Sequence, residues 1–377
     1  MKKRKVDFEM LLECTKKLLD YARINPATVV PPDALFEWSA GLVTVNRRKT
    51  IVVTNIATRC CFVLQGVNTK ELKKLDELLI EGVRTLLESE HIKPEIIEKY
   101  LDELGREVIY SKNLSRIASA RCAKAVERVE YFNVNFIPGD IFQKKNLTTF
   151  NNDLFTVEKK YMFAYEMLRD KLKERYGDDI FSREMLEIRV KLQDLACERI
   201  LTVPSDFDFD LFHKVLQAAF CWHNEHLHQF VLETDEYGRP TKIIEPAGFG
   251  DESDVDFPGM PEIEKINSSD VTLGEIFGKY KKMVYEYDFG DDWIHEIELK
   301  KVISNSPDPE AHCIKAEGDA PMEDSGGVEG FKDIQRIMKN PDDPEYEDTM
   351  EWVKSMRWNP VDQNNIDWRV RHIERGW

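Results

Sequence analysis

The chain has 377 residues, which exceeds the usual size of one hydrophobic core, so two domains are expected. Its net charge of −17 argues against a broad nucleic-acid or anionic-membrane surface, although it leaves room for a local basic patch. No apolar run reaches the length of a membrane span, and the basic start of the chain is not followed by the apolar core of a signal peptide, so the protein is predicted to be cytoplasmic.

The cysteines indicate free thiols. There are seven, scattered along the chain, and no two of them form a C-x-x-C pair. An odd, scattered set in a cytosolic protein predicts buried, unpaired side chains and neither a disulfide framework nor a zinc knuckle.

The first part of the chain predicts a small α+β domain over residues 1–135. Apolar residues at helical spacing predict a helix over 6–24, which Asn25 and Pro26 end. The other expected elements are strands over 42–45, 50–54, 60–64 and 108–111, and helices over 70–89, 94–104 and 116–131. Residues 136–182 are expected to be a connector that carries a charged helix over 157–176.

A second domain is predicted over residues 183–377. Its first elements are an expected hairpin over 185–192 and 200–203, a helix over 211–220 and a strand over 226–232. A long acidic segment, 233–270, is rich in Gly and Pro and predicts a loop. Further expected elements are a short helix over 273–277, a loop over 307–330, helices over 331–339 and 344–355, and a tail that contains Trp352, Trp358, Trp368 and Trp377. We expect this tail to close the core, with an interface or ligand stacking as the alternatives.

The stretch Met283–Leu299 carries the strongest local signal in this domain. Apolar and polar residues alternate on both sides of Gly290-Asp291-Asp292, which predicts a β-hairpin. Gly290 can take the positive φ that such a turn usually needs. Together the elements predict an α+β domain in which helices pack on a mixed or antiparallel sheet. A β-grasp-like topology is one candidate.

Four motifs in order give the second domain a family resemblance. They are L-Q-A-A-F-C-W (216–222), H-L-H-Q-F (226–230), Y-E-Y-D-F-G-D-D-W-I-H-E-I (285–297) and M-E-D-S-G-G-V-E-G-F (322–331). In these stretches the chain resembles the plasmid pRiA4b ORF-3-like family over residues 183–373. Members commonly carry cysteines around the E-D-x-G-G segment, whereas this chain has Ala320 and Ser325 there, so a cysteine-based metal site is not expected.

The first domain also resembles a small bacterial domain of unknown function. The residues that carry this likeness are Phe36-x-Trp38, Asn46-Arg47-Arg48-Lys49 and Asn55-x-x-Thr58-Arg59. Both families imply a fold without a demonstrated activity. The mobile-element and plasmid label of the first family reflects genetic context, which is associational evidence only.

Imidazole and carboxylate groups within the motifs are the candidate site residues. They are His226, His228, Asp288, Asp291, His295, Glu323 and Asp324. These groups suit a divalent metal or acid–base chemistry. In the structural alternative, His228 and His295 are hydrogen-bonded core residues on apolar faces. Asp288 then bonds only the turn amides near Gly290.

Two further segments have both a functional and a structural interpretation. Glu323 to Gly327 suits an anion cradle or metal ligands, but also a tight turn before the next helix. Arg47, Arg48 and Lys49 join two predicted strands and suit phosphate contacts, but also a solvated hairpin tip. No nucleotide-binding or common hydrolase motif is present.

Three hypotheses for function follow. The first is a cytoplasmic binding or interaction protein with a protein or small-molecule partner at a cleft near the hairpin, covered by 233–270. The second is a metal-dependent hydrolase or nuclease-like enzyme that uses the His, Asp and Glu groups. The third is a mobile-element accessory that binds DNA through the first domain. The sequence leaves the reaction, the metal, the partner and the oligomeric state open, and it indicates no membrane partner.

Overall fold

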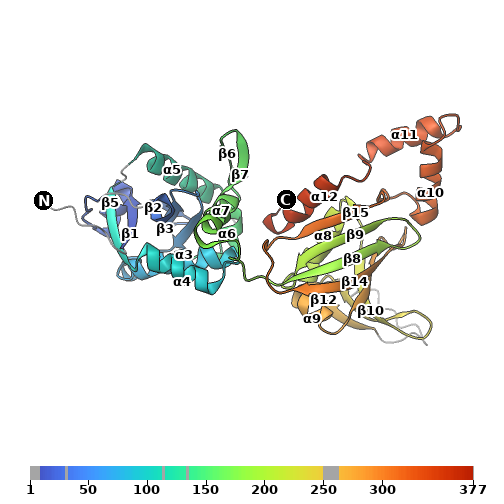
Figure 1. Cartoon of the computed structure of the whole chain (residues 1–377), viewed down its shortest axis with the longest axis horizontal. Coiled ribbons are helices and arrows are strands. Elements are labelled where there is room, and N and C mark those ends of the chain that lie inside the picture. Colours follow the sequence, from blue (N-terminus) through green and yellow to red (C-terminus); the bar gives the residue numbers. More distant parts are fainter. Residues whose placement is uncertain (1–8, 30–32, 113–114, 133–135, 249–262, 377) are drawn as a thin grey trace. The chain divides into compact units, whose positions relative to one another are not determined.

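The protein has an α+β fold with two compact units, as the sequence predicts (Figure 1). The computed structural model describes residues 9–29, 33–112, 115–132, 136–248 and 263–376. The chain divides into Met1–Ser182 and Arg183–Trp377. Among the helices that the structure describes, none is both long enough and apolar enough to cross a membrane.

A five-stranded sheet in the order β4-β3-β2-β1-β5 forms the centre of the first unit. Its strands are β1 (Glu9–Cys14), β2 (Glu37–Val45), β3 (Arg48–Asn55), β4 (Cys61–Gln65) and β5 (Glu107–Lys112). Strand β1 is parallel to both β2 and β5, and the other pairs are antiparallel. Because β1 lies between β2 and β5, its side chains are almost all buried.

Helices cover both faces of this sheet. They are α1 (Lys16–Ala22), α2 (Thr69–Leu72), α3 (Leu75–Ser89), α4 (Pro94–Leu104), α5 (Arg116–Tyr131), α6 (Leu147–Asn151) and α7 (Ala164–Tyr176). Leu79 of α3, Tyr100 of α4 and Leu168 of α7 share one core with the sheet. On the other face, Val129 of α5 packs in a smaller cluster with β3 and β4. Segment 136–182 thus contributes side chains to the first unit's core.

Two predicted helices of this unit are wrong in part. Residues 9–14 form strand β1, although a helix was predicted over 6–24. The prediction failed because a strand that is buried on both faces has no alternation of apolar and polar residues, so its sequence resembles that of a helix. Residues 154–163 form a hairpin of β6 (Leu154–Val157) and β7 (Lys160–Phe163), and helix α7 starts only after it. The side chain of Glu166 accepts a hydrogen bond from the Phe163 amide at 2.8 Å, which marks the start of α7.

The second unit contains an eight-stranded sheet in the order β12-β11-β10-β13-β14-β8-β9-β15 within the described residues. Its strands are β8 (Met185–Leu192), β9 (Glu198–Pro204), β10 (His228–Thr234), β11 (Pro240–Glu245), β12 (Glu264–Asn267), β13 (Lys282–Tyr287), β14 (Trp293–Ile303) and β15 (His312–Glu317). All neighbours are antiparallel except β11 and β12. The sheet is therefore mixed, as expected, and the β-grasp-like topology stays a prediction.

Helix α8 packs on this sheet and contributes Phe209, Phe212 and Phe220 to its aromatic core. The helices of the unit are α8 (Phe209–Phe220), α9 (Leu273–Phe277), α10 (Gly327–Met338), α11 (Tyr346–Ser355) and α12 (Gln363–Arg371). Phe209 and Phe212 of α8 contact Phe230 of β10 through their rings. Helix α12 packs on α8 and β15, so the tail helps to close the core (Figure 1).

Two predicted loops of the second unit contain strands. Segment 233–270 includes β11 and β12, and segment 307–330 includes β15. Both segments are rich in Gly, Pro and acidic residues, so the few buried apolar residues in them, such as Ile243, Ile244 and Cys313, did not produce a strand pattern. The idea that 233–270 covers a cleft rests partly on residues 249–262, which lie outside the described part of the chain.

Candidate functional site

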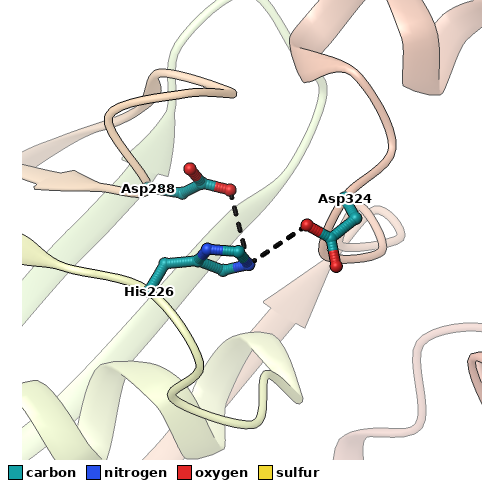
Figure 2. A group of neighbouring side chains, drawn as sticks. All are labelled: His226, Asp288 and Asp324. Atoms are coloured by element: carbon teal, nitrogen blue, oxygen red, sulfur yellow. Dashed lines mark ion pairs between the residues drawn. The ribbon is translucent and has the colours of Figure 1, made fainter.

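Three segments that are distant in sequence meet at one point of the second unit (Figure 2). His226 lies in the loop before β10, Asp288 directly follows β13, and Asp324 lies in the loop before α10. Three of the seven candidate residues therefore come together. Figure 2 shows both carboxylates approaching the same nitrogen of the His226 imidazole, Nε2.

The geometry of this cluster leaves one nitrogen without a hydrogen bond. The Nε2 atom of His226 lies 3.3 Å from Oδ1 of Asp324 and 3.6 Å from Oδ2 of Asp288. Nε2 is buried, yet it makes no hydrogen bond with any described residue. The three atoms that could ligate an ion lie within 4.8 Å of one another.

Asp288 is oriented by the turn that follows β13. Its Oδ1 accepts hydrogen bonds from the amides of Gly290 at 2.9 Å and Asp291 at 3.3 Å, so Oδ2 can face His226. Asp288 has a φ of 58° and Asp292 a φ of 53°, whereas Gly290 is not among the positive-φ residues. The prediction for Gly290 is therefore wrong. Asp tolerates this conformation because its short side chain can bond neighbouring amides.

The E-D-S-G-G segment carries Asp324 to the hairpin turn. The amide of Gly326 donates a hydrogen bond of 3.0 Å to Oδ2 of Asp291. A Cβ on Gly327 would lie 2.7 Å from the Asp291 carbonyl oxygen, and Gly327 has a φ of 69°, so glycine is required there. Asp291 thus ties two loops together and is not one of the three clustered residues. The carboxylate of Asp324 is 59% exposed, so the cluster is open on its side.

Glu323 is buried next to the cluster and supports the loop that carries His226. Its carboxylate accepts hydrogen bonds from the hydroxyl of Tyr287 and from both the amide (2.9 Å) and ring (3.0 Å) nitrogens of His223. The Tyr287 hydroxyl in turn accepts from the amides of Glu225 (3.1 Å) and His226 (3.3 Å). Burial, together with the bond to Glu323, raises the pKa of Tyr287, which keeps this hydroxyl protonated. Sequence reasoning missed Tyr287 because it alternates with the polar residues of β13 like an ordinary core side chain.

His228 and His295 belong to the core. Strand β10 begins at His228, so His226 lies outside the strand predicted over 226–232, and that part of the prediction is wrong. The ring of His228 stacks on His213 with centroids 3.5 Å apart, and burial with the nearby His213 lowers its pKa to about 3. Burial also lowers the pKa of His295 to about 3, and its Nδ1 lies 3.1 Å from the carbonyl oxygen of Trp293. Both rings are therefore neutral near pH 7.

The basic residues predicted to contact nucleic acid lie at an exposed hairpin tip. Asn46 and Arg47 form a two-residue turn with positive φ between β2 and β3. Lys49 donates a hydrogen bond of 3.1 Å to the Thr44 hydroxyl. A separate pocket of about 480 Å³ in the same unit is lined by Arg59, Arg121, Lys124 and Arg128, none of which belongs to this turn.

Comparison with known proteins confirms the predicted resemblance of both parts of the chain. Residues 184–367 match the plasmid pRiA4b ORF-3-like family. Residues 11–167 match the family described as a domain of unknown function, DUF6933. All three clustered residues lie within the pRiA4b ORF-3-like region.

A similar curated protein and a similar solved structure are likewise of unknown function. The uncharacterized protein y4hQ of Sinorhizobium fredii is 28% identical over 166 residues, which cover 44% of this chain and 78% of that protein. A crystal structure of a protein of unknown function from Methanosarcina mazei Go1 is 25% identical, with a TM-score of 0.40. The matched region covers 48% of this chain and 97% of the Methanosarcina mazei chain.

Proposed function

We propose that the pRiA4b ORF-3-like region binds a divalent transition-metal ion through His226, Asp288 and Asp324. The observation that carries this proposal is the buried Nε2 of His226, which has two carboxylate oxygens at 3.3 and 3.6 Å and no hydrogen bond within the described structure. Ligand atoms on a tetrahedral ion at about 2.1 Å are separated by roughly 3.4 Å. The two separations from Nε2, 3.3 and 3.6 Å, fit that spacing.

Charge balance supports the same proposal. Asp288 is buried, and among the described residues neither Asp288 nor Asp324 forms an ion pair with Lys or Arg. A buried carboxylate without a cation is costly, and two carboxylates match the charge of one divalent ion. The imidazole ligand favours zinc, iron or nickel over magnesium and calcium, which prefer oxygen ligands alone.

The open side of the cluster favours hydrolytic chemistry over purely structural metal binding. Three protein ligands are typical of catalytic zinc sites, where the fourth position holds water, and the bound ion lowers the pKa of that water. The exposure of Asp324 gives a substrate access to this position. In this proposal Tyr287 and Glu323 orient the loop that carries His226 without contacting the substrate. The second hypothesis from the sequence, a metal-dependent hydrolase, is thus preferred to a binding module without metal.

The test is titration of chelator-stripped, tag-free protein with Zn²⁺ by isothermal titration calorimetry. One ion per chain is expected. Asp324→Asn removes one charged ligand while keeping a side chain that tolerates the φ of 58°, and it should weaken Zn²⁺ binding by more than about 10²-fold. Asp292→Asn is the matched control, since Asp292 has a φ of 53°, lies in the adjacent turn and is not one of the three clustered residues. Its affinity should equal that of the parent.

Two results would overturn the proposal. One is the absence of stoichiometric Zn²⁺, Mn²⁺, Fe²⁺ or Ni²⁺ binding by the folded parent. The other is an equal loss of affinity in both variants, which would indicate a nonspecific effect of charge.

A further inference from the structure

A cavity of about 280 Å³ lies in the second unit beside the end of α8. Its wall combines two indole rings with three arginines: Trp222, Trp358, Arg199, Arg357 and Arg369. The cavity lies near the lower end of the usual range for small-molecule sites, about 300–1,000 Å³. Its volume therefore suits a ligand of one ring and one charged group.

The arginines of this cavity differ from the others in the second unit. Six arginines of the unit form ion pairs with Asp or Glu: Arg183, Arg189, Arg239, Arg336, Arg371 and Arg375. Among the described residues, the remaining three form none, and all three line this one cavity. In a chain of net charge −17, carboxylates are abundant, so three unpaired guanidinium groups at one cavity are a marked exception.

Arg199 is the most constrained of the three. It is 1% exposed and donates hydrogen bonds to the carbonyl oxygens of Ala219 (2.9 Å), Glu317 (2.8 Å) and Gly318 (3.1 Å). These neutral acceptors fix the guanidinium without cancelling its charge. A buried cation held in this way favours an external anion.

The acidic side chains at the cavity are engaged elsewhere. The carboxylate of Glu323 bonds Tyr287 and His223, and that of Asp362 accepts the amides of Asn364 and Asn365 at the start of α12. The two indole N–H groups are also satisfied, since Trp222 and Trp358 donate to backbone carbonyl oxygens at 2.8 Å. The rings therefore offer a ligand apolar surface, and the arginines offer charge.

We propose that this cavity binds a small phosphate ester, with the phosphate on the three arginines and the organic group against the two indoles. Phosphate is preferred to carboxylate because its two charges and three terminal oxygens match several guanidinium donors at once. The proposal does not depend on the metal site.

The test is titration of the full-length protein with phenyl phosphate in excess EDTA, followed by tryptophan fluorescence. EDTA removes metal, so metal-mediated binding at the His226 cluster cannot contribute. Saturable binding of phenyl phosphate is expected, with weaker binding of inorganic phosphate and of benzoate. Arg369→Gln and Arg357→Gln should each weaken the binding at least tenfold. Arg357 is exposed and Arg369 is half-buried, so these substitutions should impair folding less than replacement of the buried Arg199. Arg239→Gln is the control, because Arg239 pairs with Asp235 outside the cavity, and it should bind like the parent.

Three outcomes would overturn the proposal. Equal binding of benzoate and phenyl phosphate would refute the phosphate assignment. Equal affinity in the Arg369→Gln, Arg357→Gln and Arg239→Gln variants would place the ligand elsewhere. Binding that is lost in Asp324→Asn but retained in Arg369→Gln would assign it to the carboxylate cluster. Failure of the Zn²⁺ titration alone would leave this result unaffected.

Discussion

Replacement of Tyr287 by Phe tests how the loop of His226 is held. The hydroxyl donates to the buried Glu323 and accepts from the amides of Glu225 and His226. A hydrogen bond to a charged group contributes about 2 kcal/mol and each of the two neutral bonds roughly 0.5 kcal/mol, so the loss should be about 3 kcal/mol. In a unit of this size that corresponds to a decrease in Tm of roughly 6–12 °C. Guanidinium and thermal unfolding followed by tryptophan fluorescence measure both values.

The same substitution should affect metal binding separately from stability. Loss of a partner that orients a metal-ligating histidine typically weakens metal affinity by about 10–100-fold. Tyr285→Phe is the matched control, because its hydroxyl bonds the side chains of His213 and Gln217, which in turn bond Asn224, whereas the Tyr287 hydroxyl bonds the amides of Glu225 and His226 directly. The control should lose stability while keeping the parental Zn²⁺ affinity. The reasoning would be refuted if Tyr287→Phe unfolded like the parent, or if both variants bound Zn²⁺ equally.

Two further predictions concern stability. Burial by itself would lower the pKa of His312, but hydrogen bonds to Asp308 and Asp367 outweigh it and raise the pKa to about 9. The stabilisation is then complete below the unfolded value of about 6.5 and is lost as the pH rises through 9, so His312→Gln should cost about 2 kcal/mol at pH 6 and little at pH 10. An equal loss at both pH values, measured by denaturant unfolding, would exclude this linkage. Gly82→Ala in α3 would place a Cβ 2.1 Å from the ring of Phe62, so unfolding of the first unit should become easier by about 1–2 kcal/mol despite the better helix propensity of Ala. A variant as stable as the parent would mean that the Phe62 ring can move aside without cost.

Elements with a clear periodicity were predictable from the sequence alone. Helices α4 and α5 and strand β8 agree with their predicted bounds because each has one apolar face and a distinct boundary residue. Strands that are buried on both faces, or that lie between polar segments, were not predictable from the sequence. Strand β1 is buried on both faces, and β15 lies within a segment dominated by Gly, Pro and acidic residues, so neither carries the alternation of a half-buried strand.

The residue types of the candidate site were also predictable, but their grouping was not. The motifs indicated His, Asp and Glu side chains as candidates. These candidates included His228 and His295, which belong to the core, as well as His226, which belongs to the cluster. The two histidines differ because strand β10 begins at His228. His228 therefore stacks on His213 in the core, whereas His226 lies in the preceding loop. The unpaired arginines of the cavity carry no signal in the sequence, since pairing is a matter of which carboxylate lies nearby.

The sequence by itself determined the α+β class, the free cysteines, the central hairpin and the family resemblance of both halves, because these depend on local periodicity and on motifs in order. The tertiary structure decided which side chains converge. His226, Asp288 and Asp324 come from three separate loops, and their approach depends on a contact that only glycine permits, between Gly327 and the Asp291 carbonyl oxygen. Such contacts join residues far apart in sequence, so no local pattern encodes them.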